Sequence, residues 1–137
     1  MALTQITGEG LQSTLAIGSE GGAVTTSVQQ GLAKAWVNFN GTSTIAVNDS
    51  LNVASLTDDT TGTYRVNTSN AFSSVNHSPV GSNINDSTTA NRASITVAAS
   101  GSASATTSII PFALYSATAS NYLDCTDVNI HIFGDLA

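Results

Sequence analysis

The chain has 137 residues, of which 9% are charged and 6% aromatic, and its formal net charge is −6. Nucleic-acid binding needs clustered cations, whereas Lys34, Arg65 and Arg92 lie far apart in an acidic chain, so we predict no nucleic-acid partner. No run approaches the roughly 18 apolar residues of a membrane-spanning helix, and the single cysteine, Cys125, excludes an intrachain disulfide.

The first 32 residues are punctuated by glycine and carry only short apolar runs, such as 15–17 and 23–28. This pattern predicts an N-terminal arm with one or two short strands. We expect the arm to dock the chain onto neighbouring copies or onto a larger assembly. The first residues lack the basic and apolar regions of a secretory signal, which predicts a cytoplasmic start.

Residues 34–40, Lys-Ala-Trp-Val-Asn-Phe-Asn, alternate with the period of two that is typical of a strand. The alternation assigns side chains to two faces: Ala35, Val37 and Phe39 on one, and Lys34, Trp36 and Asn38 on the other. A Trp and a Phe on opposite faces predict a strand covered on both sides. A helix with apolar residues at 28, 32 and 36 also has acceptable spacing, but its glycine and the poor helix propensity that follows favour the strand.

The next segments predict short strands separated by tight connections. A turn is expected at 48–50, and the alternation slips by one near Val53, which predicts a β-bulge. Residues 58–62, Asp-Asp-Thr-Thr-Gly, predict a hairpin loop of about four to five residues between Leu56 and Tyr64.

The third quarter of the chain has fewer large apolar side chains. A strand is expected at 71–75 with Val80, broken by Pro79. A long loop is expected over 81–90, because asparagine and aspartate there are turn formers. Residues 93–99 alternate cleanly and predict another strand.

Two bulky β-rich segments follow near the C-terminus. Residues 107–115 predict a strand that Pro111 would confine to a sheet edge or a bulge. Residues 127–133 predict the last strand, with Val128, Ile130 and Ile132 on one face.

Together these elements favour one fold class. About seven to nine short strands separated by turn signals are typical of sandwiches and jelly rolls. Ser, Thr, Asn and Gly, which suit solvent-facing strand positions and turns, replace most charged residues. We therefore predict an all-β, antiparallel, jelly-roll-like β-sandwich over residues 33–137, with an extended N-terminal arm over residues 1–32.

Paired carboxylates are the first candidates for chemistry: Asp58 with Asp59, and Asp124 with Asp127. Glycosidase carboxylates must flank a bond at about 5–9.5 Å, which neighbours in a turn seldom do. We interpret these residues as turn formers. A calcium site built on Asp58 and Asp59 is a less favoured alternative, because the EF-hand spacing is missing.

The two histidines and the cysteine are the remaining reactive side chains. No Gly-x-Ser-x-Gly elbow accompanies His77 or His131, and no second cysteine accompanies Cys125. We predict that His131 faces solvent or a subunit neighbour and that Cys125 is a small buried apolar residue. We predict no catalytic, cofactor-binding or metal-binding residue.

Exposed aromatic side chains are the last candidates. Trp36, Tyr64, Tyr115 and Tyr122 could stack on sugar rings, while asparagine and aspartate bond sugar hydroxyls. Core packing is the favoured interpretation for Trp36.

Several segments together resemble a small β-domain of tailed-bacteriophage virion proteins, of the tail-fibre type. They are residues 33–42, Ala-Lys-Ala-Trp-Val-Asn-Phe-Asn-Gly-Thr; residues 49–67, Asp-Ser-Leu-Asn-Val-Ala-Ser-Leu-Thr-Asp-Asp-Thr-Thr-Gly-Thr-Tyr-Arg-Val-Asn; and the closing Val-Asn-Ile-His-Ile-Phe-Gly-Asp, residues 128–135. The resemblance covers residues 33–80 and 126–137. It implies a non-enzymatic structural protein of the virion, assembled in the bacterial cytoplasm and usually trimeric.

Two roles remain open within that resemblance. In the first, the chain is a fibre or spike module exposed on the particle, which contacts other virion proteins and a host surface glycan. In the second, it is a capsid cement or decoration protein that stabilises the head lattice, a role favoured by a chain too short to supply a fibre stalk. A glycan-hydrolysing enzyme is disfavoured, because the sequence lacks a suitable carboxylate constellation.

Overall fold

The computed structural model describes residues 16–18, 25–27, 31–84, 93–97, 104–116 and 120–137. The chain divides into two compact units, Met1–Leu32 and Ala33–Ala137. In the first unit, β1 (Ala16–Gly18) pairs antiparallel with β2 (Thr25–Ser27). Both strands of the described residues fall in the part of the chain for which short strands are expected.

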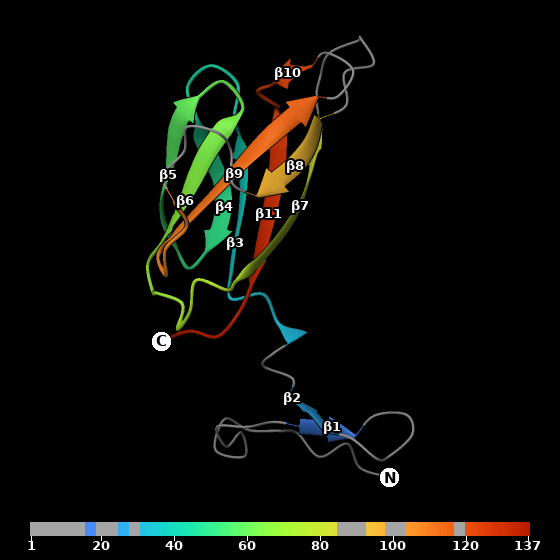
Figure 1. Ribbon diagram of the computed structural model, residues 1–137. Coiled ribbons are helices and arrows are strands. Elements are labelled where there is room, and N and C mark those ends of the chain that lie inside the picture. The colour runs from blue at the N-terminus through green and yellow to red at the C-terminus, as the bar shows by residue number, and fades with distance from the viewer. Residues whose placement is uncertain (1–15, 19–24, 28–30, 85–92, 98–103, 117–119) are drawn as a thin grey trace. The chain divides into compact units, whose positions relative to one another are not determined.

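The second unit is built from two antiparallel sheets that face each other (Figure 1). One has four strands in the order β4-β3-β11-β7: β4 (Ala46–Leu51), β3 (Ala35–Asn40), β11 (Asp127–Phe133) and β7 (Ser78–Ile84). The other has five strands: β10 (Asn121–Tyr122), β9 (Ile109–Ser116), β6 (Thr63–Thr68) and β5 (Val53–Thr60) in that order, with β8 (Ala93–Val97) also paired to β9. The predicted all-β antiparallel sandwich is therefore confirmed.

The core lies between the two sheets and follows the predicted alternation. Its fully buried members come from β3, β11, β6 and β9, from Phe72 and from Cys125; the strand residues are Ala35, Val37, Phe39, Val128, Ile130, Ile132, Tyr64, Val66, Ile110, Phe112 and Leu114. Phe39 meets Tyr64 of the other sheet edge to face, with ring centroids 5.2 Å apart. Edge-to-face aromatic pairs add an attraction that depends on ring orientation to the stabilisation that comes from burying apolar area.

The strands at 35–40 and 127–133 are neighbours in the four-stranded sheet. Val37 pairs with Ile130, and Phe39 pairs with Val128, so both inner faces are apolar in register. This confirms the strand rather than the helix at 35–40. It also confirms the bounds predicted for the last strand.

A one-residue corner carries the chain from β4 in the four-stranded sheet to β5 in the five-stranded sheet. Asn52 separates β4 from β5 and adopts φ 56°, a left-handed conformation that asparagine tolerates better than most residues. Its side chain donates to Lys34 O at 3.1 Å and accepts from Asn70 N at 2.8 Å. The slip predicted near Val53 is confirmed, because the β5–β6 register shifts between Val53 and Ser55.

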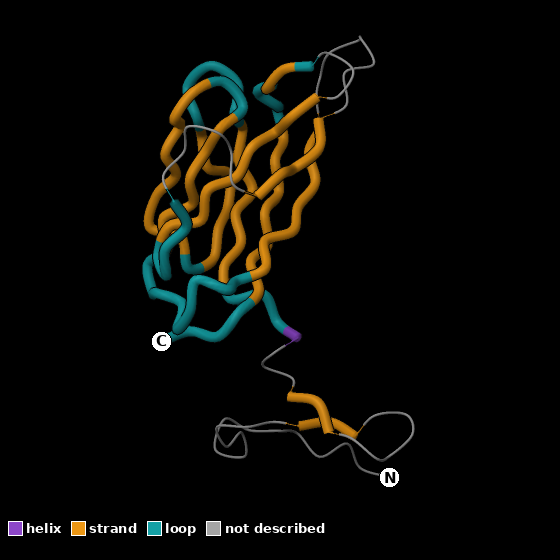
Figure 2. Tube along the Cα trace, in the orientation of Figure 1, coloured by secondary structure: helices purple, strands orange, loops and turns teal. Residues whose placement is uncertain are grey.

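The turn predicted at 48–50 is wrong, whereas the hairpin predicted between Leu56 and Tyr64 is confirmed with a shorter loop. β4 runs through 48–50, because a register shift between Asn38 and Phe39 on its partner β3 accommodates the polar run within the sheet. Asp58 lies within β5, not in a turn, so only Thr61 and Gly62 connect β5 to β6. Gly62 supplies φ 66°, which lets the shorter loop close. The loops and turns of the second unit lie mostly at the two ends of its strands (Figure 2).

The strand expected at 71–75 is also wrong. Phe72 makes only an isolated bridge with Leu136, and the strand β7 begins after it, includes Pro79 and reaches Ile84. Pro79 is tolerated because β7 is the outermost strand of the four-stranded order. The rest of the loop expected over 81–90 lies outside the described residues, as do residues 98 and 99 of the strand expected at 93–99.

Pro111 does not confine its strand to an edge. β9 lies between β6 and β8, and Pro111 pairs with Arg65 of β6. Leu114 N donates toward Gly62 O next to β6, so by alternation the Pro111 nitrogen points to the other side. The described part of β8 pairs with β9 as far as Phe112, one residue short of Pro111.

Candidate functional site

Asp124 has a structural role between β6 and the segment that precedes β11. Its Oδ1 accepts from the Tyr64 hydroxyl at 2.6 Å and from Gly62 N at 2.6 Å, and Gly41 O also lies 3.1 Å from that hydroxyl. Burial raises the pKa of Tyr64, and the hydrogen bond to Asp124 raises it further. The carboxylate therefore ties together residues about 60 positions apart in sequence.

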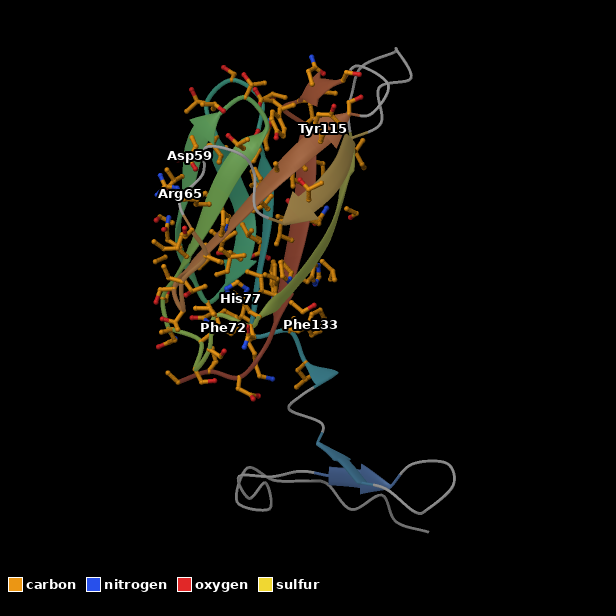
Figure 3. The ribbon with its side chains drawn as sticks, in the orientation of Figure 1. Asp59, Arg65, Phe72, His77, Tyr115 and Phe133 are labelled. Atoms are coloured by element: carbon orange, nitrogen blue, oxygen red, sulfur yellow. The ribbon has the colours of Figure 1, made fainter. Side chains whose placement is uncertain are left out.

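Asp58 and Asp59 are neighbours on β5, where Asp58 pairs with the core residue Tyr64 and Asp59 contacts Arg65. Asp59 accepts from Arg65 Nε at 2.9 Å and from Nη2 at 2.5 Å, a bidentate pair between β5 and β6 (Figure 3). This hydrogen bonding raises the pKa of the Arg65 guanidinium. Partial burial, followed by the charges of Asp124 and Asp59, raises the pKa of Asp58. The structure thus brings Asp58, Asp59 and Asp124 near one another and leaves Asp127 on the four-stranded sheet.

The histidines and the cysteine lie on separate elements. His77 stacks near Phe72, with ring centroids 5.4 Å apart, and its Nε2 lies 3.2 Å from Thr106 O (Figure 3). His131 is exposed on β11, as expected. Cys125 is fully buried, which confirms its expected environment, and burial raises the pKa of its thiol. The described residues hold no group of three or more His, Cys, Asp or Glu arranged to bind a metal ion.

The aromatic candidates separate into buried and outer residues. Tyr64 is 0% exposed, so the expectation that it could stack on a sugar is wrong. Tyr115 and Tyr122 pack edge to face across β9 and β10, with ring centroids 5.4 Å apart. Trp36 does not belong to the core cluster, contrary to the favoured interpretation; it is half-buried on the outward face of β3.

The outward face of the four-stranded sheet, which we call the outer face, carries two rows of side chains that run across all four strands. The first is largely apolar and consists of Leu51, Trp36, His131 and Val80, which are directly paired from strand to strand. The second lies two residues along each strand and consists of Asp49, Asn38, Asn129 and Ser82. Because paired residues on one face have Cβ atoms about 5 Å apart, each row forms a continuous band.

The second row is held by a network of amide and carboxylate hydrogen bonds. Asn38 Nδ2 donates to Asp127 Oδ1 at 2.6 Å and to Asn129 Oδ1 at 2.8 Å. Asn129 Nδ2 donates to the same Asp127 oxygen at 3.0 Å, and Asn48 Nδ2 donates to Asn38 Oδ1 at 2.7 Å. The network links β4, β3 and β11 and fixes the directions of four polar side chains.

The first row leaves large apolar side chains in solvent. Leu51 and Val80 are each 50% exposed, and Ile84, which pairs with Asp127 on the same face, is 62% exposed. Apolar groups rimmed by polar ones on one face are typical of binding surfaces. The outer face is therefore the candidate functional site of the described part of the chain.

Comparisons with protein-family models, with curated proteins and with solved structures found no match to this chain. Within the described residues, no helix has the length and apolar character needed to cross a membrane.

Sequence reasoning missed the outer face as a unit. Its members come from segments centred near residues 36, 49, 81 and 130, and only the strand register brings them into rows. One signal was present: Trp36 and Asn38, like His131 and Asn129, are two residues apart on strands whose other faces are wholly apolar. Two such strands predict polar outer faces, but not that these faces adjoin.

Proposed function

We propose that this chain is a non-enzymatic structural module of a tailed-phage virion, exposed on the particle and assembled as a homotrimer. The observation that carries the proposal is the resemblance of residues 33–80 and 126–137 to phage virion β-domains. These segments supply three whole strands of the four-stranded sheet, β3, β4 and β11, and the start of β7. The segments that carry the resemblance are thus also those that build the outer face.

The chemistry of the described polar groups supports a binding role over a catalytic one. Asp124 ties Tyr64 to Gly62, and Asp59 is bound to Arg65. Asp124 and Asp59 are therefore both engaged in contacts that stabilise the fold. Three exposed apolar side chains of the sheet, Leu51, Val80 and Ile84, by contrast lie on one face, where they suit contact with a partner.

Particle association is the test of this function. Virions of the phage that encodes the chain would be purified, analysed by mass spectrometry and labelled with gold-conjugated antibody against the recombinant chain. A few copies per particle, located on the tail, are expected for a fibre or spike module. Hundreds of copies over the head would instead establish the capsid decoration role, and absence from washed particles would overturn the virion proposal.

The oligomer and the arm form a second part of the proposal. A homotrimer buries area that a chain with 6% aromatic residues cannot bury alone. Residues 1–32 are proposed to join the module to neighbouring copies or to other virion proteins. Light scattering should give about three times the chain mass of 13.9 kDa. A monomer whose first 32 residues are removed rapidly by protease would contradict both ideas.

A further inference from the structure

The outer face combines an aromatic row with a polar row whose hydrogen-bonding directions are fixed in advance. Trp36 and His131 are direct cross-strand neighbours, and Asn38 and Asn129 are direct neighbours one step along the same strands. The two rows lie about 7 Å apart, and each spans three inter-strand steps, or about 14 Å. A ligand that fits both must have an apolar side and a polar edge in one extended molecule.

From this arrangement we infer that the outer face binds a neutral oligosaccharide laid across the strands. A pyranose ring presents C–H groups on its face, which attract the negative face of an aromatic ring. Its hydroxyls lie at the edge of the ring and both donate and accept hydrogen bonds. Trp36 and His131 suit the ring faces, and the neighbouring amides suit the edges.

The polar network leaves hydrogen-bonding capacity for the ligand. Each asparagine amide has two N–H donors, and a carboxylate has two acceptor oxygens. Among the described contacts, Asn48 and Asn129 each use one N–H, and Asp127 uses only Oδ1. One donor on each asparagine and the second oxygen of Asp127 therefore stay available, on side chains that are already held in place. Ordering them in advance lowers the entropic cost of binding.

Charge favours a neutral ligand over an anionic one. Asp49 and Asp127 lie on this face, and Lys34 is the one cation that alternation places on its described part. The whole chain carries a net charge of −6. Sialylated, uronic or phosphorylated sugars would meet net repulsion.

Trp36 is the only tryptophan of the chain, so its fluorescence reports on the outer face alone. The full chain would be titrated with neutral tetrasaccharides built from glucose, galactose, mannose, rhamnose or N-acetylated hexosamines, and with tetragalacturonate as the anionic comparison. At least one neutral sugar should change the emission saturably, with a dissociation constant of about 1 mM or tighter. Tetragalacturonate should bind at least about tenfold more weakly.

Matched variants separate the network from the fold. Asn129→Ala should weaken binding about tenfold, the loss expected for one or two hydrogen bonds. Asn38→Ala should also weaken binding, because Asn38 uses both N–H groups to hold Asp127 and Asn129 in place. Asn67→Ala is the control, because Asn67 makes a similar amide network with Ser55 and Thr57 on the five-stranded sheet. It should leave the affinity within about twofold. If a variant does not fold, saturation-transfer NMR of the unmodified chain takes the place of that affinity measurement. In this experiment the ring protons of the bound sugar should receive magnetisation from the protein.

Three results would overturn the inference: no response to any neutral sugar at about 10 mM, equal losses in Asn129→Ala and Asn67→Ala, or an emission change on dilution that follows dissociation of the oligomer. The third result would mean that the outer face is an interface between copies of the chain. The inference deepens the proposed function and takes its biological setting from it, but the two can fail separately. A chain found on particles that binds no sugar loses only the inference, and a sugar-binding chain absent from particles loses only the virion role.

Discussion

The two faces of β3 and β11 differ in burial and in polarity. On the inner face, Val37 and Ile130 are at most 1% exposed and pack between the sheets. On the outer face, Asn38 and Asn129 are held by hydrogen bonds to each other and to Asp127, beside exposed apolar side chains. One pair of strands thus stabilises the sandwich on one side and offers a polar, ordered surface on the other. Substitutions that affect one face only can test this division.

The largest effect is expected at the centre of the core. Phe39→Ala removes a ring packed edge to face on Tyr64 and Phe112. The free energy of unfolding, measured by urea titration followed by circular dichroism, should fall by about 3–5 kcal/mol. Trp36→Ala is the matched control on the outer face and should cost clearly less, because a half-buried side chain leaves no closed cavity. Equal losses would contradict the division between the faces.

A smaller loss is expected when the buried polar contact of the core is removed. Tyr64→Phe keeps the ring and deletes the hydroxyl that bonds Asp124, which leaves a carboxylate oxygen with fewer partners. The expected cost is about 1–3 kcal/mol at neutral pH, measured by the same urea titration. A variant as stable as the original chain would show that the contact contributes nothing to the fold.

The same hydroxyl predicts how stability changes in alkali. Because the folded-state pKa of Tyr64 is raised above the ordinary 10.0, the native state holds a proton that the unfolded state releases. The contribution of Tyr64 to the free energy of unfolding should therefore be full below about pH 10 and decrease as the pH rises above it. Tyr64→Phe should reduce the alkaline fall and leave the part due to Cys125, whose pKa is also raised. An unchanged pH profile in Tyr64→Phe would contradict the assignment.

The sheet-to-sheet corner offers a finer test. Asn52→Ala and Asn52→Gly both delete the side-chain bonds to Lys34 O and Asn70, but only glycine tolerates φ 56° freely. Asn52→Ala should therefore be less stable than Asn52→Gly by about 1 kcal/mol, as compared by urea titration. If alanine is the more stable of the two, the corner does not depend on the left-handed backbone.

The smallest change in stability is expected at the Asp59–Arg65 ion pair of the five-stranded sheet. Asp59→Asn weakens the bidentate contact with Arg65, a surface pair whose side chains are 26% (Arg65) and 18% (Asp59) exposed and so partly screened by solvent. The urea midpoint should shift less than for any substitution above, and the shift should shrink as salt is added. A shift as large as that of Tyr64→Phe would mean that the pair has a structural role comparable with the core contact.

Local patterns predicted the strands well and the contacts between distant segments poorly. The alternation of residues 127–133 gave the bounds and the buried face of β11, because period-2 patterning is a property of the segment itself. Sequence patterns leave Tyr64 as a candidate for sugar stacking, because no nearby residue indicates Asp124, its partner in the fold. They place Pro111 at an edge, because the pairing of β9 with β6 on one side and β8 on the other is fixed by distant segments.

The outer face shows the same limit. The residues Trp36 and His131 could each be placed on an outward side by alternation, but their pairing is fixed by the register of β3 and β11. That register depends on the inner faces, where Val37 must lie opposite Ile130 for both to be buried. The candidate site is thus a consequence of core packing on the other side of the same strands.

The most direct test of the division is a urea titration of Ile130→Ala and Asn129→Ala, neighbours on β11, with and without the tightest-binding neutral tetrasaccharide. A ligand that binds only the native state raises its stability by an amount that grows with the logarithm of its affinity. Ile130→Ala should lose about 2–5 kcal/mol and be stabilised by the sugar as much as the original chain. Asn129→Ala should lose much less stability and be stabilised clearly less by the sugar. If both variants lose the same stability, or if the sugar stabilises Asn129→Ala as much as the original chain, the two faces do not divide these roles.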